Sequence, residues 1–132
     1  MLNDRRADAR EFGQESERLA ERYLRRKGYD ILERNVQFPE GELDLVAKQG
    51  EVIVFVEVKA RRSTAMGGAA YAVQAEKRTR LIRVAARYLA EHNGVGASAR
   101  FDVVLIQQDG AGQPAVEHIE NAFEVPAGDQ RW

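Results

Sequence analysis

Residues 51–60 read EVIVFVEVKA and form the clearest predicted strand of the chain. Successive side chains of a strand point to opposite faces of the sheet. One face of this segment begins with Ile53 and Phe55. The opposite face carries valines only, namely Val52, Val54, Val56 and Val58. A strand that is apolar on both faces is typical of the centre of a sheet that is covered on both sides. We therefore expect an α/β domain built around this segment.

The segments on either side predict two helices and four further strands. The expected helices span residues 10–27 and 72–92, where apolar side chains recur at three- and four-residue steps. Gly28 supplies the stop of the first helix. The other expected strands span residues 29–38, 41–47, 100–107 and 115–119. The order α-β-β-β-α-β-β predicts a mixed sheet with helices on its faces, and the last, short strand is expected at an edge.

The expected domain occupies residues 10–123, between a flexible N-terminus (1–9) and a loose C-terminal tail (124–132). The segment 41–47, GELDLVA, alternates and is separated from the central strand by a short turn, so the two strands are expected to form a hairpin. In this segment one face is expected to carry Leu43, Leu45 and Ala47. The other face is expected to carry Glu42, Asp44 and Val46.

The composition is that of an ordinary globular domain. The chain has 132 residues, of which 44% are hydrophobic and 31% are charged, and this length is typical of one domain. It has no cysteine, which excludes disulfides and thiolate metal sites. The longest apolar run near the middle is too short to cross a bilayer, and the charged first residues do not resemble a signal peptide. We therefore expect a cytoplasmic protein with no membrane partner.

The net charge of −1 hides an uneven distribution. Residues 59–87 contain eight basic residues and one acid, whereas residues 28–58 contain seven acids and two basic residues. The last 32 residues contain six acids and one arginine. Because a local patch rather than the net charge attracts a polyanion, the basic middle is compatible with nucleic-acid binding.

Charged residues at the end of the central strand are the first sign of a functional site. Glu57 and Lys59 follow Ile53 and Phe55 on one face. Burial of such a charge costs roughly several kcal/mol per ion, so buried charged residues usually have a partner. Asp44, on the preceding strand, would converge with Glu57 if both side chains point to the same side.

Two carboxylates, a backbone carbonyl such as that of Val58, and waters make the oxygen-rich shell that Mg²⁺ or Mn²⁺ prefers. Lys59 beside them could orient or deprotonate the attacking water, or stabilise charge on a phosphate. On the residues alone, two alternatives stay open. Glu57 and Lys59 could be a buried structural ion pair, or they could lie at a partly exposed end of the sheet.

Acids on the first helix could complete such a shell. Glu15, Glu17 and Glu21 are candidates, and spacing alone does not choose between them. The simpler interpretation is a solvated helix face on which these acids pair with Arg18, Arg22 and Arg25.

The second helix carries a basic stripe, and so does the end of the central strand. Lys77, Arg80, Arg83 and Arg87 recur at three- and four-residue steps with few acids on the same helix. The stripe is either a solvated face or a contact surface for the phosphates of a nucleic acid. Arg61 and Arg62 follow Lys59 and could grip flanking phosphates. The two histidines, His92 and His118, do not have the spacing of a zinc site.

Several segments together resemble the uncharacterised bacterial YraN-like family. They include Gly13-x3-Glu17, GELDL at 41–45, FVEVKAR at 55–61, RFDVV at 100–104 and His118-Ile-x-Asn-Ala-Phe123. That family is identified as a member of the restriction-endonuclease-like superfamily and is similar to archaeal Holliday-junction resolvases. The resemblance implies an α-β-β-β-α-β core.

The resemblance also implies roles for individual residues. Asp44 and Glu57 would bind metal, Lys59 would be the catalytic lysine, and Glu17 would join the metal shell. Leu43 stands before Asp44, where many members of the superfamily have proline.

The expected function is that of a Mg²⁺- or Mn²⁺-dependent DNA endonuclease that selects branched DNA such as a four-way junction. Junction cleavage needs two nicks and is therefore compatible with a symmetric homodimer. The alternative is a non-catalytic nucleic-acid-binding module of the same fold, which would use only the basic stripe. A third possibility is a protein-interaction subunit whose acids are structural.

Overall fold

A computed structural model describes residues 2–61, 75–92, 98–108 and 111–123 of the chain. Within these ranges it has two helices, α1 (Leu2–Arg26) and α2 (Ala75–Glu91). The strands are β1 (Asp30–Phe38), β2 (Gly41–Gln49), β3 (Val52–Arg61), β4 (Ala99–Gln108) and β5 (Pro114–Phe123). The predicted order α-β-β-β-α-β-β is therefore confirmed.

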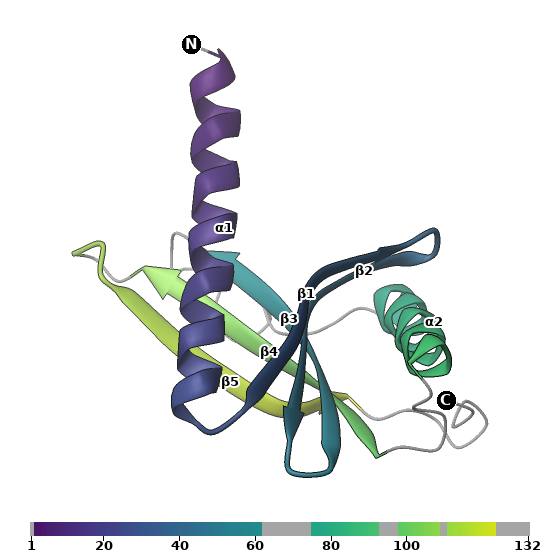
Figure 1. The fold of residues 1–132 in the computed structure, drawn as a ribbon. Helices are drawn as coiled ribbons and strands as arrows, with labels where there is room; N and C mark the ends of the chain where they lie inside the picture. The colour runs from purple at the N-terminus through teal and green to yellow at the C-terminus, as the bar shows by residue number, and fades with distance from the viewer. Residues whose placement is uncertain (1, 62–74, 93–97, 109–110, 124–132) are drawn as a thin grey trace.

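The strands form one mixed sheet in the order β1-β2-β3-β4-β5 (Figure 1). Neighbouring strands are antiparallel except β3 and β4, which are parallel. A parallel pair needs a crossover connection, and α2 lies within it. β3 is central, as its two apolar faces predicted. The fold is thus an α/β core of the expected kind, followed by an extra strand.

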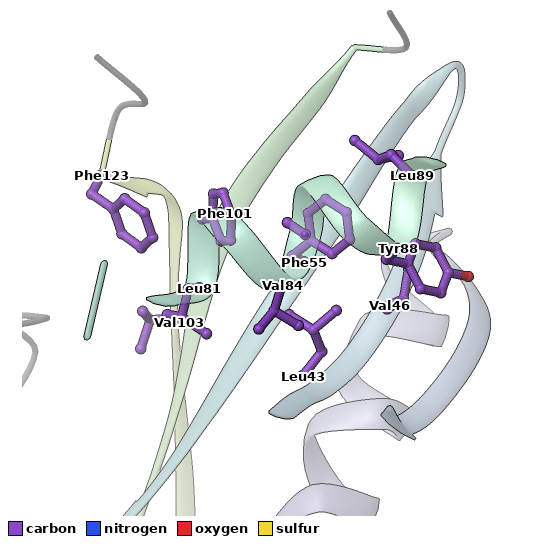
Figure 2. Close-up of a cluster of buried hydrophobic side chains, with 11 residues drawn as sticks. Leu43, Val46, Phe55, Leu81, Val84, Tyr88, Leu89, Phe101, Val103 and Phe123 are labelled. Atoms are coloured by element: carbon purple, nitrogen blue, oxygen red, sulfur yellow. The ribbon is translucent and has the colours of Figure 1, made fainter. Parts of the chain in front are cut away.

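The two helices pack on opposite faces of the sheet. Ala20 and Leu24 of α1 lie in one apolar cluster with Leu45, Val54 and other side chains of the sheet. The second cluster lies between α2 and the other face. Figure 2 shows it: Leu81, Val84, Tyr88 and Leu89 of α2 meet Leu43, Val46, Phe55, Phe101, Val103 and Phe123. β3 therefore contributes Phe55 to one core and its valines to the other, as predicted.

Helix α1 begins at Leu2, eight residues before its predicted start, and its N-terminal half extends beyond the sheet (Figure 1). Its end at Arg26 is one residue before the predicted end, and Gly28 follows it as expected. The N–H of Tyr29 donates to the carbonyl of Leu24, and the N–H of Gly28 donates to that of Arg25. Gly28 has a φ of 91°, which only glycine adopts readily. These bonds form a Schellman cap, and Tyr29 and Leu24 complete it by packing in the same cluster.

Two local predictions were wrong. Leu43 does not share a face with Leu45 and Ala47: it packs under α2, whereas the other two pack under α1. β2 therefore departs from strict alternation next to Asp44. β5 is not short, since it runs over Pro114–Phe123. Most side chains of β5 are exposed, so the sequence shows no apolar pattern over its full length. Its position at an edge of the sheet is confirmed.

A buried polar network joins β4, β5 and the end of α1. The carboxylate of Asp102 accepts bonds from Arg100 Nε (3.0 Å) and from the N–H of Asn121 (3.0 Å), and it lies 2.7 Å from Nε2 of His118. The side chains of Asp102 and His118 are 0% and 1% exposed. Burial opposes the charge of Asp102, but these partners hold the pKa of its carboxyl below the usual value. The network lies on the α1 side, where Tyr23 and Tyr29 pack edge-on against His118.

Neither described helix combines the length and the apolar character needed to cross a bilayer.

Candidate active site

The candidate site lies where the pairing of β2 with β3 ends. The last paired residues are Leu45 and Val56. One step further along, the carboxylate Oδ2 of Asp44 accepts the backbone N–H of Val58 at 2.8 Å. A side-chain oxygen thus binds an N–H that a strand carbonyl would otherwise bind. This contact holds Asp44 against β3, so the expected convergence of Asp44 and Glu57 is present.

A cavity of about 320 Å³ opens beside these two acids, between the sheet and the start of α2. Its charged lining consists of Glu42, Asp44, Glu57, Lys77 and Arg80. The other described residues of its lining are Gly41, Leu81 and Val84. A Cβ at Gly41 would lie 3.3 Å from a methyl group of Val84, so glycine at the start of GELDL lets α2 approach the sheet. The cavity is therefore a charged pocket whose floor includes the apolar side chains of Leu81 and Val84 from α2.

Two lysines lie beside Glu57. Nζ of Lys77 is 2.5 Å from Oε1 of Glu57, and Nζ of Lys59 is 3.9 Å from the same oxygen. The Glu57 side chain is only 13% exposed, whereas those of Lys59 and Lys77 are 26% and 35% exposed. Glu57 is thus an almost buried ion-pair partner whose cations still reach solvent. This arrangement combines the two alternatives that the residues had left open, a buried ion pair and a partly exposed sheet end.

Asp44 lies in an environment that disfavours its charge. Burial raises the pKa of its carboxyl to about 7, and the nearby carboxylates of Glu57, Glu17 and Glu42 act in the same direction. The bond from Val58 opposes this shift only in part. The site thus has an excess of negative charge that a cation would relieve.

Among the three candidate acids of α1, Glu17 is the one directed to the site. Burial raises the pKa of Glu17, as do the charges of Glu42 and Glu57, while a side-chain hydrogen bond from Asn35 lowers it. Glu21 instead binds Arg25 and Arg34, and Glu15 is exposed. Glu17 is near enough to influence Asp44, but it does not line the cavity.

The basic stripe of α2 divides into paired and unpaired residues. Lys77 binds Glu57, and Arg87 binds Glu40 and Glu91. Arg80 and Arg83 are exposed and form no ion pair with the described part of the chain. These acid partners come from β3 (Glu57), from the turn between β1 and β2 (Glu40) and from α2 itself (Glu91). Arg61 is the last residue of β3, and Arg62 lies outside the described residues.

Two residues of the site had not been recognised from the sequence. Glu42 lines the cavity, and the alternation of GELDL had already put it on the same face as Asp44. Asn35 has a φ of 51° and stands opposite Asp44 in the β1–β2 register. Asparagine adopts this backbone conformation more readily than most residues, and its side chain here reaches Glu17. Its role depends on a backbone conformation and on a contact with α1, which no local sequence pattern indicates.

The donor set suits a hard divalent cation. Asp44 and Glu57 offer carboxylate oxygens at one cavity, and Mg²⁺ is commonly held by one or two carboxylates together with waters and substrate phosphates. In the described ranges no group of three or more histidine, aspartate or glutamate side chains is placed to hold a metal ion. Asp44 and Glu57 are thus the two carboxylates of this cavity that could hold a cation together with water.

Comparisons with known proteins agree with the sequence motifs. The profile described as "Uncharacterised protein family UPF0102" matches residues 16–106. A UPF0102 protein of Beutenbergia cavernae is 49% identical over 82% of this chain and 92% of its own length. Another, from Desulfosudis oleivorans, is 40% identical over 95% of this chain and 96% of its own length.

A solved structure, that of Pyrococcus furiosus SfsA in complex with Ca²⁺, is similar with a TM-score of 0.41 and 14% identity. The match covers 89% of this chain and 65% of that chain. The family profile and the UPF0102 relatives extend over most of the sequence, so the chain belongs to the uncharacterised protein family UPF0102, as its YraN-like motifs predicted.

Proposed function

We propose that this protein is a Mg²⁺- or Mn²⁺-dependent DNA endonuclease that acts on branched DNA. The observation that carries the proposal is the gathering of Asp44, Glu57 and Lys59 where β2 and β3 separate, beside a charged cavity. Folding alone would favour apolar residues at the end of a central strand. An acid pair with an adjacent ammonium is suited to phosphodiester hydrolysis.

In this proposal Asp44 and Glu57 would hold the cation, with the carbonyl of Val58 as a further oxygen donor. Glu17 does not line the cavity, so its carboxylate would join them only after moving toward it. When bound, the cation supplies Lewis-acid activation of water and neutralises charge on the phosphate. The water would attack phosphorus and lose one proton to solvent, the bond to the leaving oxygen would break, and that oxygen would take up a proton from solvent. The ammonium of Lys59, held beside Glu57, stabilises the negative charge that develops on the phosphate.

The exposed arginines of α2 support a nucleic-acid substrate. Arg80 lines the cavity and Arg83 follows one turn later, and neither is neutralised by a described acid. They would bind phosphates on either side of the cleaved bond, together with Arg61, Arg62 and a displaced Lys77. Cleavage of both strands of a junction requires two such sites, so a homodimer belongs to the proposal.

The test is cleavage of duplex, flap, single-stranded and four-way-junction DNA in the presence of Mg²⁺ or Mn²⁺. We expect Asp44→Ala and Glu57→Ala to reduce cleavage by about a hundredfold or more. Glu51→Gln, in the exposed turn of the same hairpin, is the matched control and should keep full activity. Cleavage that survives both alanine substitutions would come from another site or a contaminant.

Lys59→Ala separates chemistry from binding. Because Lys59 acts on the charge that develops during the reaction, its loss should abolish cleavage and leave DNA affinity nearly unchanged. An equal loss of affinity would make Lys59 a simple phosphate contact. DNA binding without cleavage, unaffected by metal, would instead favour the non-catalytic nucleic-acid-binding module.

A further inference from the structure

Lys77 reaches from α2 to the carboxylate that the proposed function assigns to the cation. Its Nζ lies 2.5 Å from Oε1 of Glu57, within hydrogen-bond distance. Lys59, at 3.9 Å from the same oxygen, is too far away for such a bond. Glu57 is 13% exposed, so few waters compete for its oxygens. Lys77 is therefore the direct partner of this carboxylate.

The second cation of the cavity is placed differently. Arg80 lines the same cavity, but its side chain is exposed and forms no ion pair with a described acid. Burial would lower the pKa of Lys77, but its bond to Glu57 and the charge of Asp44 raise it. Lys77 thus balances the acid pair directly, whereas Arg80 adds only a nearby positive charge.

We propose that Lys77 is a resident counter-ion of Glu57 and competes with the divalent cation for the same carboxylate oxygen. The inference rests on the proposed function, because the competing cation is the one assigned to Asp44 and Glu57. Two cations cannot share one carboxylate oxygen closely without strong repulsion. The Lys77 side chain is long, flexible and 35% exposed, so it can withdraw into the cavity when the metal enters.

This competition has a consequence for the fold. With Lys77 in place, the acidic site is partly neutralised and α2 is tied to β3 without any metal. Binding of the cation breaks that tie and releases an ammonium into the cavity that Arg80 also lines. Lys77 therefore sets how tightly the site holds metal, and it does so before any DNA is present.

The test measures Mn²⁺ binding to the full-length, metal-free protein without DNA, by calorimetry and by the electron paramagnetic resonance signal of free Mn²⁺. We expect Lys77→Gln to tighten Mn²⁺ binding by about tenfold, because the ion no longer displaces an ammonium. Lys77→Arg keeps the charge and should bind Mn²⁺ like the unaltered protein. Arg80→Gln removes one positive charge from the same cavity without breaking the Glu57 contact, so its effect should be about twofold at most.

The outcomes separate this inference from the proposed function. If the unaltered protein binds Mn²⁺ but Lys77→Gln has no more effect than Arg80→Gln, or weakens binding, the competition is overturned and the endonuclease proposal stands. If only Lys77→Gln binds Mn²⁺, the competition is supported and metal-dependent catalysis by the native protein is overturned. If no variant takes up Mn²⁺, both are overturned.

Discussion

The negative charge of Asp44 is opposed by its surroundings in the metal-free protein. Burial and three neighbouring carboxylates raise the pKa of this carboxyl to about 7, from an unfolded value near 4. The folded protein therefore holds a proton on Asp44 that the unfolded chain has already released between these pH values. Stability from this group is fully present below about pH 4 and is lost as pH rises through 7.

Asp44→Asn should consequently stabilise the metal-free protein. Asparagine removes the unfavourable charge, and its carbonyl oxygen can still accept the N–H of Val58. We expect a gain of roughly 1–3 kcal/mol in unfolding free energy at pH 8 and no gain at pH 4, measured by urea unfolding. Asp30→Asn, exposed at the start of β1, is the control. Equal stability of Asp44→Asn and the unaltered protein at pH 8 would contradict the assigned environment.

Individual site residues were predictable where a charge interrupted an apolar pattern. Glu57 and Lys59 stood out because they end a strand with two apolar faces, and Asp44 followed from the adjacent strand. Asn35 and Asp102 could not be assigned a role in this way. Asn35 acts through a backbone conformation and a contact to α1, and Asp102 acts through partners on β5, none of which has a signature in local sequence.

Helix α2 carries arginines of two kinds: Arg87 near its C-terminal end is ion-paired, whereas Arg80 and Arg83 in its middle have no described acid partner. Arg87 is held by Glu40 and Glu91. A phosphate can therefore bind Arg80 or Arg83 without first breaking an ion pair. The uniform stripe that the sequence predicted is in fact two groups with different availability.

Under the proposed function, the salt dependence of DNA binding should reveal this division. Each lost phosphate contact lowers the slope of log K against log salt by about 0.9 in magnitude. We expect the double variant Arg80→Gln/Arg83→Gln to lower it by about 1.8 in fluorescence anisotropy titrations. Arg87→Gln, the matched control, should leave the slope unchanged. A slope that changes with Arg87 and not with the pair would place DNA on the other end of the helix.

The pairing of strands β4 and β5 is stabilised by the buried Asp102 network. Asp102→Ala would leave His118 buried and Arg100 largely buried without their carboxylate. We expect a loss of about 3–5 kcal/mol in unfolding free energy at pH 7. Glu120→Gln on β5, the strand of His118, should cost less than about 1 kcal/mol, because that side chain is half-exposed. Similar losses for the two variants, measured by urea unfolding, would contradict a special role for the network.

Across the whole molecule, Asp44 and Asp102 make stability depend on pH in opposite directions. The pKa of Asp102 is lowered, so its contribution is present above about pH 4 and lost as pH falls through its folded value. The pKa of Asp44 is raised to about 7, so its contribution is lost as pH rises toward that value. The two effects together favour maximal stability in mildly acidic solution.

We therefore expect the melting temperature of the metal-free protein to be highest between about pH 4 and 6 and lower at pH 8. Under the proposed function, Mg²⁺ should raise it more at pH 8 than at pH 5, because protons compete for Asp44 at the lower pH. Differential scanning fluorimetry with and without Mg²⁺ measures both effects. A Mg²⁺ effect that is equal at both pH values, or persists in Asp44→Asn/Glu57→Gln, would show that the cation binds elsewhere.

The architecture was predictable because it follows from the periodicity of the hydrophobic residues and from the order of the helices and strands. The apolar runs of β3 and β4 identified central strands, and the helix between them implied a parallel pair. The start of α1 was missed because residues 2–9 are charged and carry no apolar stripe to mark a helix. The face of Leu43 was missed because alternation assumes a regular strand, whereas β2 leaves β3 at Asp44.

The hydrogen bond from Val58 to Asp44 gives this protein a built-in spectroscopic reporter. An amide proton held by a carboxylate resonates at a frequency that shifts when that carboxylate is protonated, metallated or mutated. A single cross-peak in a nitrogen–proton correlation spectrum, followed through a titration, would thus report occupancy of the proposed metal site without a label or a substrate. The rate at which the same proton exchanges with solvent would report how often β2 and β3 separate at this point.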